Sequence, residues 1–166
     1  MNTKFLKKDI NNIKLSNTNS ELSFFVSKKS FLDKNLFSIK DLFMEISYVA
    51  KNEYGLSSEE FYSSLCQKQN NEFIILDNGI LLINNLFEKI KKNCLIFFRL
   101  KSPITYEKNN TADIIFTLVS PKNINTASKL QILSKLTRIL KKSNIRKKII
   151  GVEKPEDVLA ILMPSI

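Results

Sequence analysis

The chain has 166 residues, of which 43% are hydrophobic, and this is enough for one ordinary domain with a sizeable core. Its formal net charge is +10, from 26 Lys and Arg residues against 16 Asp and Glu residues, and it contains no histidine. The longest apolar stretches, such as the one around Leu95–Leu100, are far shorter than the roughly 20 residues that span a bilayer. We therefore expect no membrane insertion, and because the N-terminus lacks an apolar signal core, we expect a cytoplasmic protein.

The origin of the positive charge bears on the choice of partner. Only Arg99, Arg138 and Arg146 are arginines, whereas the readout of base edges depends on the guanidinium group. Lys, Asn, Ile and Phe are abundant while Gly, Arg and Trp are scarce or missing, which is typical of an A+T-rich genome. We attribute the basicity to mutational drift and do not expect a nucleic-acid partner. The alternative, a basic nucleic-acid-associated domain, stays open because one dense cluster could attract a phosphate-rich partner: Lys141, Lys142, Arg146, Lys147 and Lys148.

The two cysteines give no sign of a metal site. Cys66 and Cys94 are far apart in the sequence, and there is no histidine to complete a ligand set. We expect two buried or half-buried free thiols, no metal and no cofactor.

In chain order, the sequence begins with a polar extension and continues with two helices. Residues 1–35 are an N-terminal extension of uncertain order, in which the apolar patch Leu22–Val26 could form a short strand, and residues 36–166 form the domain. From Ile39, apolar residues recur at helical spacing, with Ser38 as the N-cap and Gly55 as the C-cap. A second helix, to about Cys66, begins after the capping box formed by Ser57 and Glu60.

Strands follow, and then helices again. Phe73–Leu76 and Ile80–Ile83 predict a hairpin, because the residues between them, Asp77-Asn78-Gly79, favour a tight turn. Residues 94–100 and 113–119 predict buried strands, and residues 102–112 between them predict a loop. Helical spacing returns in residues 126–142, and a last short helix begins near Lys154. This order of helices and strands is typical of the α/β class.

Four motifs resemble those of one bacterial family. Residues 68–84, KQNNEFIILDNGILLIN, match in spacing a loop of the form R-E-x-x-G-S-T-G-I-G-x-G-I-A-I-P-H. FRLKSPI and ADIIFTLVSP resemble two strands of that family, and LQILSKLTRIL resembles its long helix. The family is the type-2 enzyme IIA domain of the bacterial sugar phosphotransferase system (PTS EIIA type-2), the fructose/mannitol group, and most closely its nitrogen-regulatory member. The resemblance covers roughly residues 38–163 and implies a single domain with a central mixed sheet flanked by helices.

The resemblance also implies a site that has lost its chemistry. The phosphoacceptor histidine of the family corresponds to Asn84, and its second histidine corresponds to Gln131. The family arginine that holds the phosphoryl group corresponds to Lys68, and of the loop glycines only Gly79 is kept. Because an amide nitrogen cannot attack phosphorus as an imidazole does, no catalytic residue is intact, and Lys68 with Gly79 would form at most a weakened phosphate site.

The implied function is regulatory. We expect a pseudoenzyme related to EIIA that acts by binding proteins, such as a phosphocarrier resembling HPr or a regulated kinase or transporter. One alternative is a phosphorelay component phosphorylated on a substitute residue, for which Asp77 is the candidate. For Asn84, Gln131 and Lys68 there is also a plain interpretation, as a turn residue, a helix surface residue and an exposed lysine.

Overall fold

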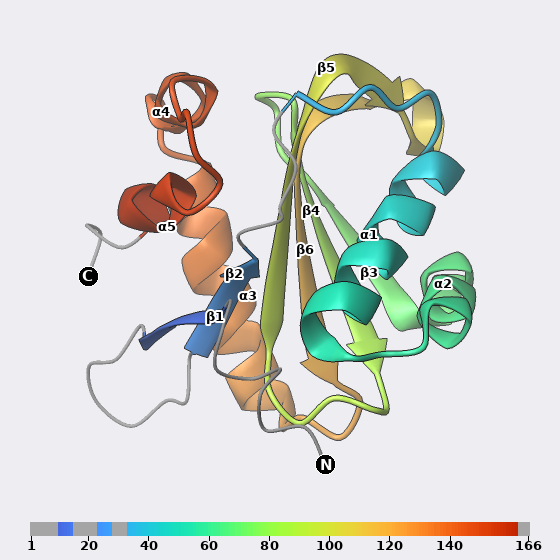
Figure 1. Cartoon of the computed structure of the whole chain (residues 1–166). Coiled ribbons are helices and arrows are strands. Elements are labelled where there is room, and N and C mark those ends of the chain that lie inside the picture. Colours follow the sequence, from blue (N-terminus) through green and yellow to red (C-terminus); the bar gives the residue numbers. More distant parts are fainter. Residues whose placement is uncertain (1–9, 15–22, 28–32, 163–166) are drawn as a thin grey trace.

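The computed structural model describes residues 10–14, 23–27 and 33–162 (Figure 1). The helices and strands follow one another in this order: β1 (Ile10–Lys14), β2 (Ser23–Ser27), α1 (Ile39–Tyr54), α2 (Ser58–Cys66), the 3-10 turn η1 (Lys68–Asn70), β3 (Asn71–Ile75), β4 (Ile80–Phe87), β5 (Cys94–Thr105), the 3-10 turn η2 (Glu107–Asn109), β6 (Thr111–Pro121), α3 (Thr126–Leu140), α4 (Ile145–Ile150) and α5 (Asp157–Leu162).

The strands form one mixed sheet in the order β1-β2-β5-β6-β4-β3. Three neighbouring pairs are antiparallel, namely β1 with β2, β5 with β6, and β3 with β4. Two pairs are parallel, namely β2 with β5 and β4 with β6. The carboxyl ends of β4 and β6 therefore meet at the same edge of the sheet.

Helices cover both faces of this sheet. Figure 1 shows α1 and α2 on one face and α3, α4 and α5 on the other. Successive residues of a strand point to opposite faces, so Leu82 packs with the α3 side while Leu81 packs with the α1 side. Both faces of β4 are apolar between Ile80 and Ile83, as expected for a strand buried on both sides. The fold is an α/β domain with a central mixed sheet flanked by helices, as predicted.

The predicted helix caps of the first two helices are confirmed. The Ser38 side chain accepts a hydrogen bond from the Asp41 backbone N–H at 3.1 Å, and Gly55 ends α1 with φ of 67°. The Ser57 side chain accepts one from the Glu60 N–H at 3.4 Å. These bonds satisfy backbone donors that a helix leaves unpaired at its start.

The predicted hairpin is confirmed, but its second strand is longer than the sequence indicated. β4 continues beyond Ile83 through Asn84 and Asn85 to Phe87, in parallel register with β6. The predicted loop 102–112 is also mostly extended, since β5 runs to Thr105 and β6 begins at Thr111. An irregularity in the register between Arg99 and Ile104 separates the two parts of β5.

Helix α4 was missed, and α5 begins at Asp157 rather than near Lys154. α4 has only six residues, and no side chain caps its first turn. Its other end is held by Arg99 of β5, whose Nη1 lies 3.1, 2.8 and 2.7 Å from the carbonyl oxygens of Ile149, Ile150 and Val152. The same guanidinium donates two hydrogen bonds to the Asp33 carboxylate. Arg99 thus supplies a donor to the last carbonyls of α4 and to the Val152 carbonyl just beyond it.

Both β1 and β2 come from the predicted N-terminal extension. β2 includes most of the patch predicted as a strand, while Leu22 and much of residues 1–32 lie outside the described residues. Val26 of β2 pairs with Leu95 of β5, so this strand is part of the sheet. The domain boundary at residue 36 stays a prediction. Among the described residues, no helix has the length and apolar character needed to cross a membrane.

Candidate functional site

Asn84 lies inside β4 and is almost completely buried, with 1% of its surface exposed. It stands opposite Leu118 of β6 on one side and Glu72 of β3 on the other. The interpretation of Asn84 as a turn residue is therefore wrong. Its side chain points to the same face as Leu82, which is the face covered by α3.

The amide nitrogen of Asn84 is hydrogen-bonded to β6. Its Nδ2 donates one hydrogen bond to the Leu118 carbonyl at 3.0 Å and another to the Ser120 Oγ at 3.1 Å. Ser120 is itself fully buried. Because a buried amide without partners is costly, these two bonds explain how a polar residue is tolerated at the centre of the sheet.

Asn85 faces the opposite layer and was missed as a structural residue. Its Nδ2 lies 2.6 Å from the Asn71 Oδ1 and 3.4 Å from the Ser64 Oγ. Asn71 in turn donates to the Leu65 carbonyl at the end of α2. The Asn85 Oδ1 is buried and has no hydrogen-bond partner among the described residues. The sequence pointed to a structural role for Asn85 only through the pair of asparagines that follows the apolar residues 80–83.

The other residues that the resemblance selected are on the surface. Lys68 lies in η1 and is exposed, and its side chain makes no hydrogen bond or ion pair with any described residue. Gln131 lies on the second turn of α3 and is exposed, although its neighbours Ile132 and Leu133 are buried. Gln131 is on the α3 side of the sheet, as Asn84 is, but no hydrogen bond joins them within the described part of the chain.

Gly79 directly precedes β4 and is five residues before Asn84. Five residues of a strand span about 16 Å, so the two residues are not neighbours. Gly79 has φ of 74°, and a Cβ atom there would lie 2.9 Å from the Arg146 Nη1 and 3.3 Å from the Asp113 Oδ1. Asp77, the candidate substitute acceptor, is exposed in the turn beside this glycine. The structure therefore does not bring Asp77 and Gly79 together with Asn84.

Beside Gly79, Arg146 of α4 forms a bidentate ion pair with Asp113 of β6. Both nitrogen–oxygen distances are 2.7 Å, and Nη1 also donates to the Asn78 carbonyl at 3.0 Å. The hydrogen bond with Asp113 raises the pKa of Arg146, and partial burial acts against that rise. An aspartate at the start of a buried strand is costly without a partner, and Arg146 supplies one. The pair fixes α4 to the hairpin turn.

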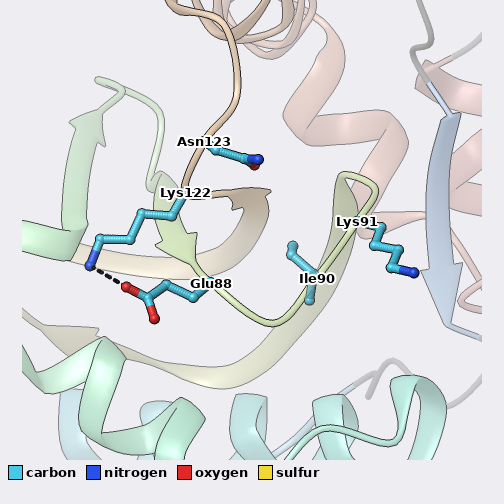
Figure 2. A pocket seen from close by; sticks show the side chains of 5 residues that line it. All are labelled: Glu88, Ile90, Lys91, Lys122 and Asn123. Carbon is cyan, nitrogen blue, oxygen red and sulfur yellow. Dashed lines mark hydrogen bonds and ion pairs between the residues drawn. The ribbon is translucent and has the colours of Figure 1, made fainter.

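A cavity of about 570 Å³ opens where β4 and β6 end (Figure 2). Figure 2 shows the Lys122 ammonium paired with the Glu88 carboxylate, at 3.2 Å, on one side of it. The cavity is lined by Glu88, Ile90, Lys91, Lys122 and Asn123. Asn84 is not among these residues, so its side chain does not line the cavity. No group of three or more Cys, Asp or Glu residues that could hold a metal is found in the described ranges.

The comparisons with known proteins agree with this architecture. The model of the family described as "Phosphoenolpyruvate-dependent sugar phosphotransferase system, EIIA 2" matches residues 23–164. Comparison with curated proteins finds no match.

Solved structures share the fold at low identity. The nitrogen regulatory protein IIA-Ntr from Neisseria meningitidis superposes with a TM-score of 0.71 at 23% identity, covering 82% of this chain and 95% of that one. The IIA mannitol protein of Escherichia coli gives 0.63 at 14% identity, covering 81% and 96%. The complex of E. coli enzyme IIAMTL with phosphorylated enzyme IIBMTL gives 0.64 at 13% identity, covering 81% and 94%. With the family model matching most of its length, the chain belongs to the EIIA type-2 family of the phosphotransferase system.

Proposed function

We propose that this chain is an EIIA type-2 domain that no longer accepts a phosphoryl group at the position of Asn84 and acts instead by binding other proteins. The observation that carries the proposal is the state of Asn84, which is 1% exposed and donates both amide hydrogens to β6. A phosphoryl acceptor must reach the donor's phosphorus with a free lone pair, and an amide nitrogen has no basic lone pair to offer.

The rest of the chain supports the same conclusion. With no histidine in the sequence, a phosphohistidine cannot form anywhere. Lys68 and Gln131, at positions where the family resemblance implies phosphate-binding groups, are isolated surface side chains in this structure. A domain of this kind would present one constant surface to its partners, regardless of the phosphorylation state of the cell.

The partners we propose are proteins of the phosphotransferase type or the proteins they regulate. One structure with this fold is a complex of IIAMTL with phosphorylated IIBMTL. In this chain the fold is kept while the acceptor is not, so the contact surface could survive the loss of transfer. Candidate partners are a phosphocarrier resembling HPr, a kinase or a transporter.

The test is a phosphorylation assay read by intact-protein mass. The purified chain is incubated with phosphoenolpyruvate, enzyme I and phosphocarrier from its own host, and an EIIA type-2 domain with an intact acceptor histidine serves as the positive control. We expect a phosphate-sized mass increase on the control and none on this chain. An increase on this chain would overturn the proposal, and mapping it to Asp77 would establish a relay that runs on a substitute residue.

A further inference from the structure

The positive charge of this chain is concentrated in one segment. Between Asp113 and Glu153 the sequence has no acidic residue, yet this stretch holds nine of the 26 basic residues: Lys122, Lys129, Lys135, Arg138, Lys141, Lys142, Arg146, Lys147 and Lys148. The other 17 basic residues are almost balanced by all 16 Asp and Glu residues. Mutational drift toward lysine would act along the whole chain, so it does not explain this separation of charge.

Eight of these nine basic residues, all but Lys122, belong to α3, α4 and the turn between them, which lie in one layer (Figure 1). On α3 the residues Gln131, Lys135 and Arg138 recur at helical spacing on the side away from the buried Ile132 and Leu136. α4 adds Lys147 and Lys148, both exposed. We define the basic face as Lys135, Arg138, Lys141, Lys147 and Lys148.

None of the five cations of the basic face forms an ion pair within residues 10–14, 23–27 and 33–162. In contrast, Lys122 is paired with Glu88 and Arg146 with Asp113. The face therefore keeps its charge for an external anion, at a cost in like-charge repulsion.

The composition of the basic face favours a phosphate backbone over other anionic partners. Centres of protein–protein interfaces are depleted of lysine and enriched in aromatic residues, and this chain has no Phe, Tyr or Trp after Phe116. The same lack removes the stacking platforms on which single-stranded nucleic acids depend. An amphipathic helix that lies in a membrane needs a free apolar side, whereas that side of α3 is buried against the sheet.

We propose that the basic face binds the phosphate backbone of double-stranded nucleic acid without reading its sequence. α3 has 15 residues and is about 22 Å long, and a duplex carries roughly a dozen phosphates over that distance. Lysine is suited to such binding because it acts as a point charge, while base readout would require bidentate contacts. This binding is independent of the phosphoacceptor position, so its test and the phosphorylation assay can fail separately.

The experiment measures the affinity of the whole chain for a labelled DNA duplex of about two helical turns, by fluorescence anisotropy, between about 50 and 200 mM salt. If four or five cations contact phosphates, the slope of log K against log salt is about −4, because each contact contributes about −0.9. Two duplexes of unrelated sequence should bind equally.

A matched pair of variants assigns the binding to the basic face. One variant carries Lys135→Gln, Arg138→Gln and Lys141→Gln. The control carries Lys40→Gln, Lys92→Gln and Lys101→Gln, which remove the same charge from exposed positions outside the basic face. We expect the first variant to bind at least about tenfold more weakly at 100 mM salt, with a shallower slope, and the control to change about twofold or less. Circular dichroism confirms that both variants fold.

Four outcomes would overturn the proposal. These are no binding at about 50 mM salt, an equal loss in the two variants, tighter binding to poly-L-glutamate than to the duplex, and tighter binding to vesicles rich in phosphatidylserine. The second outcome would show a general effect of net charge. The third would assign the basic face to an acidic protein surface, and the fourth to a membrane surface.

Discussion

At the scale of single residues, Asn84 and Asn85 connect three strands and a helix from adjacent positions. Asn84 joins β4 to β6, and Asn85 joins β4 to β3 and α2. Two neighbouring residues of a strand can do this only because they point to opposite faces. Asn84, which the resemblance places at the phosphoacceptor position, is buried in the core, and this gives it a measurable contribution to stability.

Replacing Asn84 by Ala should lower the free energy of unfolding by about 2–3 kcal/mol, since the Leu118 carbonyl and the buried Ser120 hydroxyl would lose a donor. Urea denaturation measures the change. The control is Asn123→Ala, an exposed asparagine whose loss should change stability by about 0.5 kcal/mol or less. Equal effects for the two variants would contradict a structural role for Asn84.

The thiol of Cys94 makes stability depend on alkaline pH. Burial raises its pKa from 9.0 to about 12, whereas Cys66 is exposed, contrary to the expectation of two hidden thiols. Above pH 9 the unfolded chain loses this proton while the folded chain keeps it, so stability falls by about 1.4 kcal/mol per pH unit until about pH 12. Below pH 9 the contribution is constant.

Urea denaturation at pH 8, 9.5 and 10.5 tests this dependence on Cys94. Because Lys and Tyr residues also titrate in this range, the quantity that matters is the difference in slope between the wild type and Cys94→Ala. We expect the wild type to lose more stability with rising pH, by up to about 1.4 kcal/mol per unit. Parallel profiles would contradict the prediction.

At the scale of helices, strands and turns, the three glycines differ in how well their backbone and surroundings would accept a side chain. Gly79 has φ of 74° and no room for a Cβ beside Arg146; Gly55 has φ of 67° and open space; Gly151 has φ of −78°. Replacement by Ala should therefore cost most at Gly79, about 2 kcal/mol or more, and about 1 kcal/mol at Gly55. At Gly151 it should be neutral or stabilising by up to about 1 kcal/mol. Thermal denaturation of the three variants tests the order, and a different order would contradict the assignment of the turn.

The sequence predicts those parts of the fold that rest on local signals. Ser38, Gly55 and Ser57 act on backbone groups a few residues away, so their caps were recognisable, and the turn at Gly79 was too. The continuation of β4 was not recognisable, because two asparagines favour a turn unless distant partners satisfy them. The Ser120 hydroxyl that satisfies Asn84 is 36 positions away.

The short helix α4 was missed for a related reason. It buries only Ile145 and Ile149, and the charges between them conceal this spacing. What holds it are Asp113 and Arg99, which belong to two strands. For the candidate site, the resemblance selects Asn84, but the sequence could not show that this side chain is buried, since burial depends on the packing of β6 and β3 around it.

At the scale of the whole molecule, the separation of charge should make stability depend on salt. Lys135 and Arg138 on α3 and Lys141 at its C-cap are like charges three residues apart, and such pairs each cost roughly 0.2–0.5 kcal/mol at low salt. Raising the salt concentration from about 10 to 150 mM should increase the free energy of unfolding by about 1 kcal/mol, because the repulsion is screened. The Lys135→Gln, Arg138→Gln, Lys141→Gln variant should respond less, as measured by urea denaturation. An equal response would show that the repulsion lies elsewhere.

The hydrogen bonds from Arg99 to the end of α4 also affect the order of folding. A six-residue helix is too short to persist in water by itself, so α4 depends on a guanidinium that is about 50 positions earlier in the chain. During synthesis, β5 with Arg99 leaves the ribosome before α4, so the side chain that binds the end of α4 is made before the helix itself. α4 should therefore form late, only after the strands have paired, and it should be among the first parts of the fold to exchange its amide hydrogens.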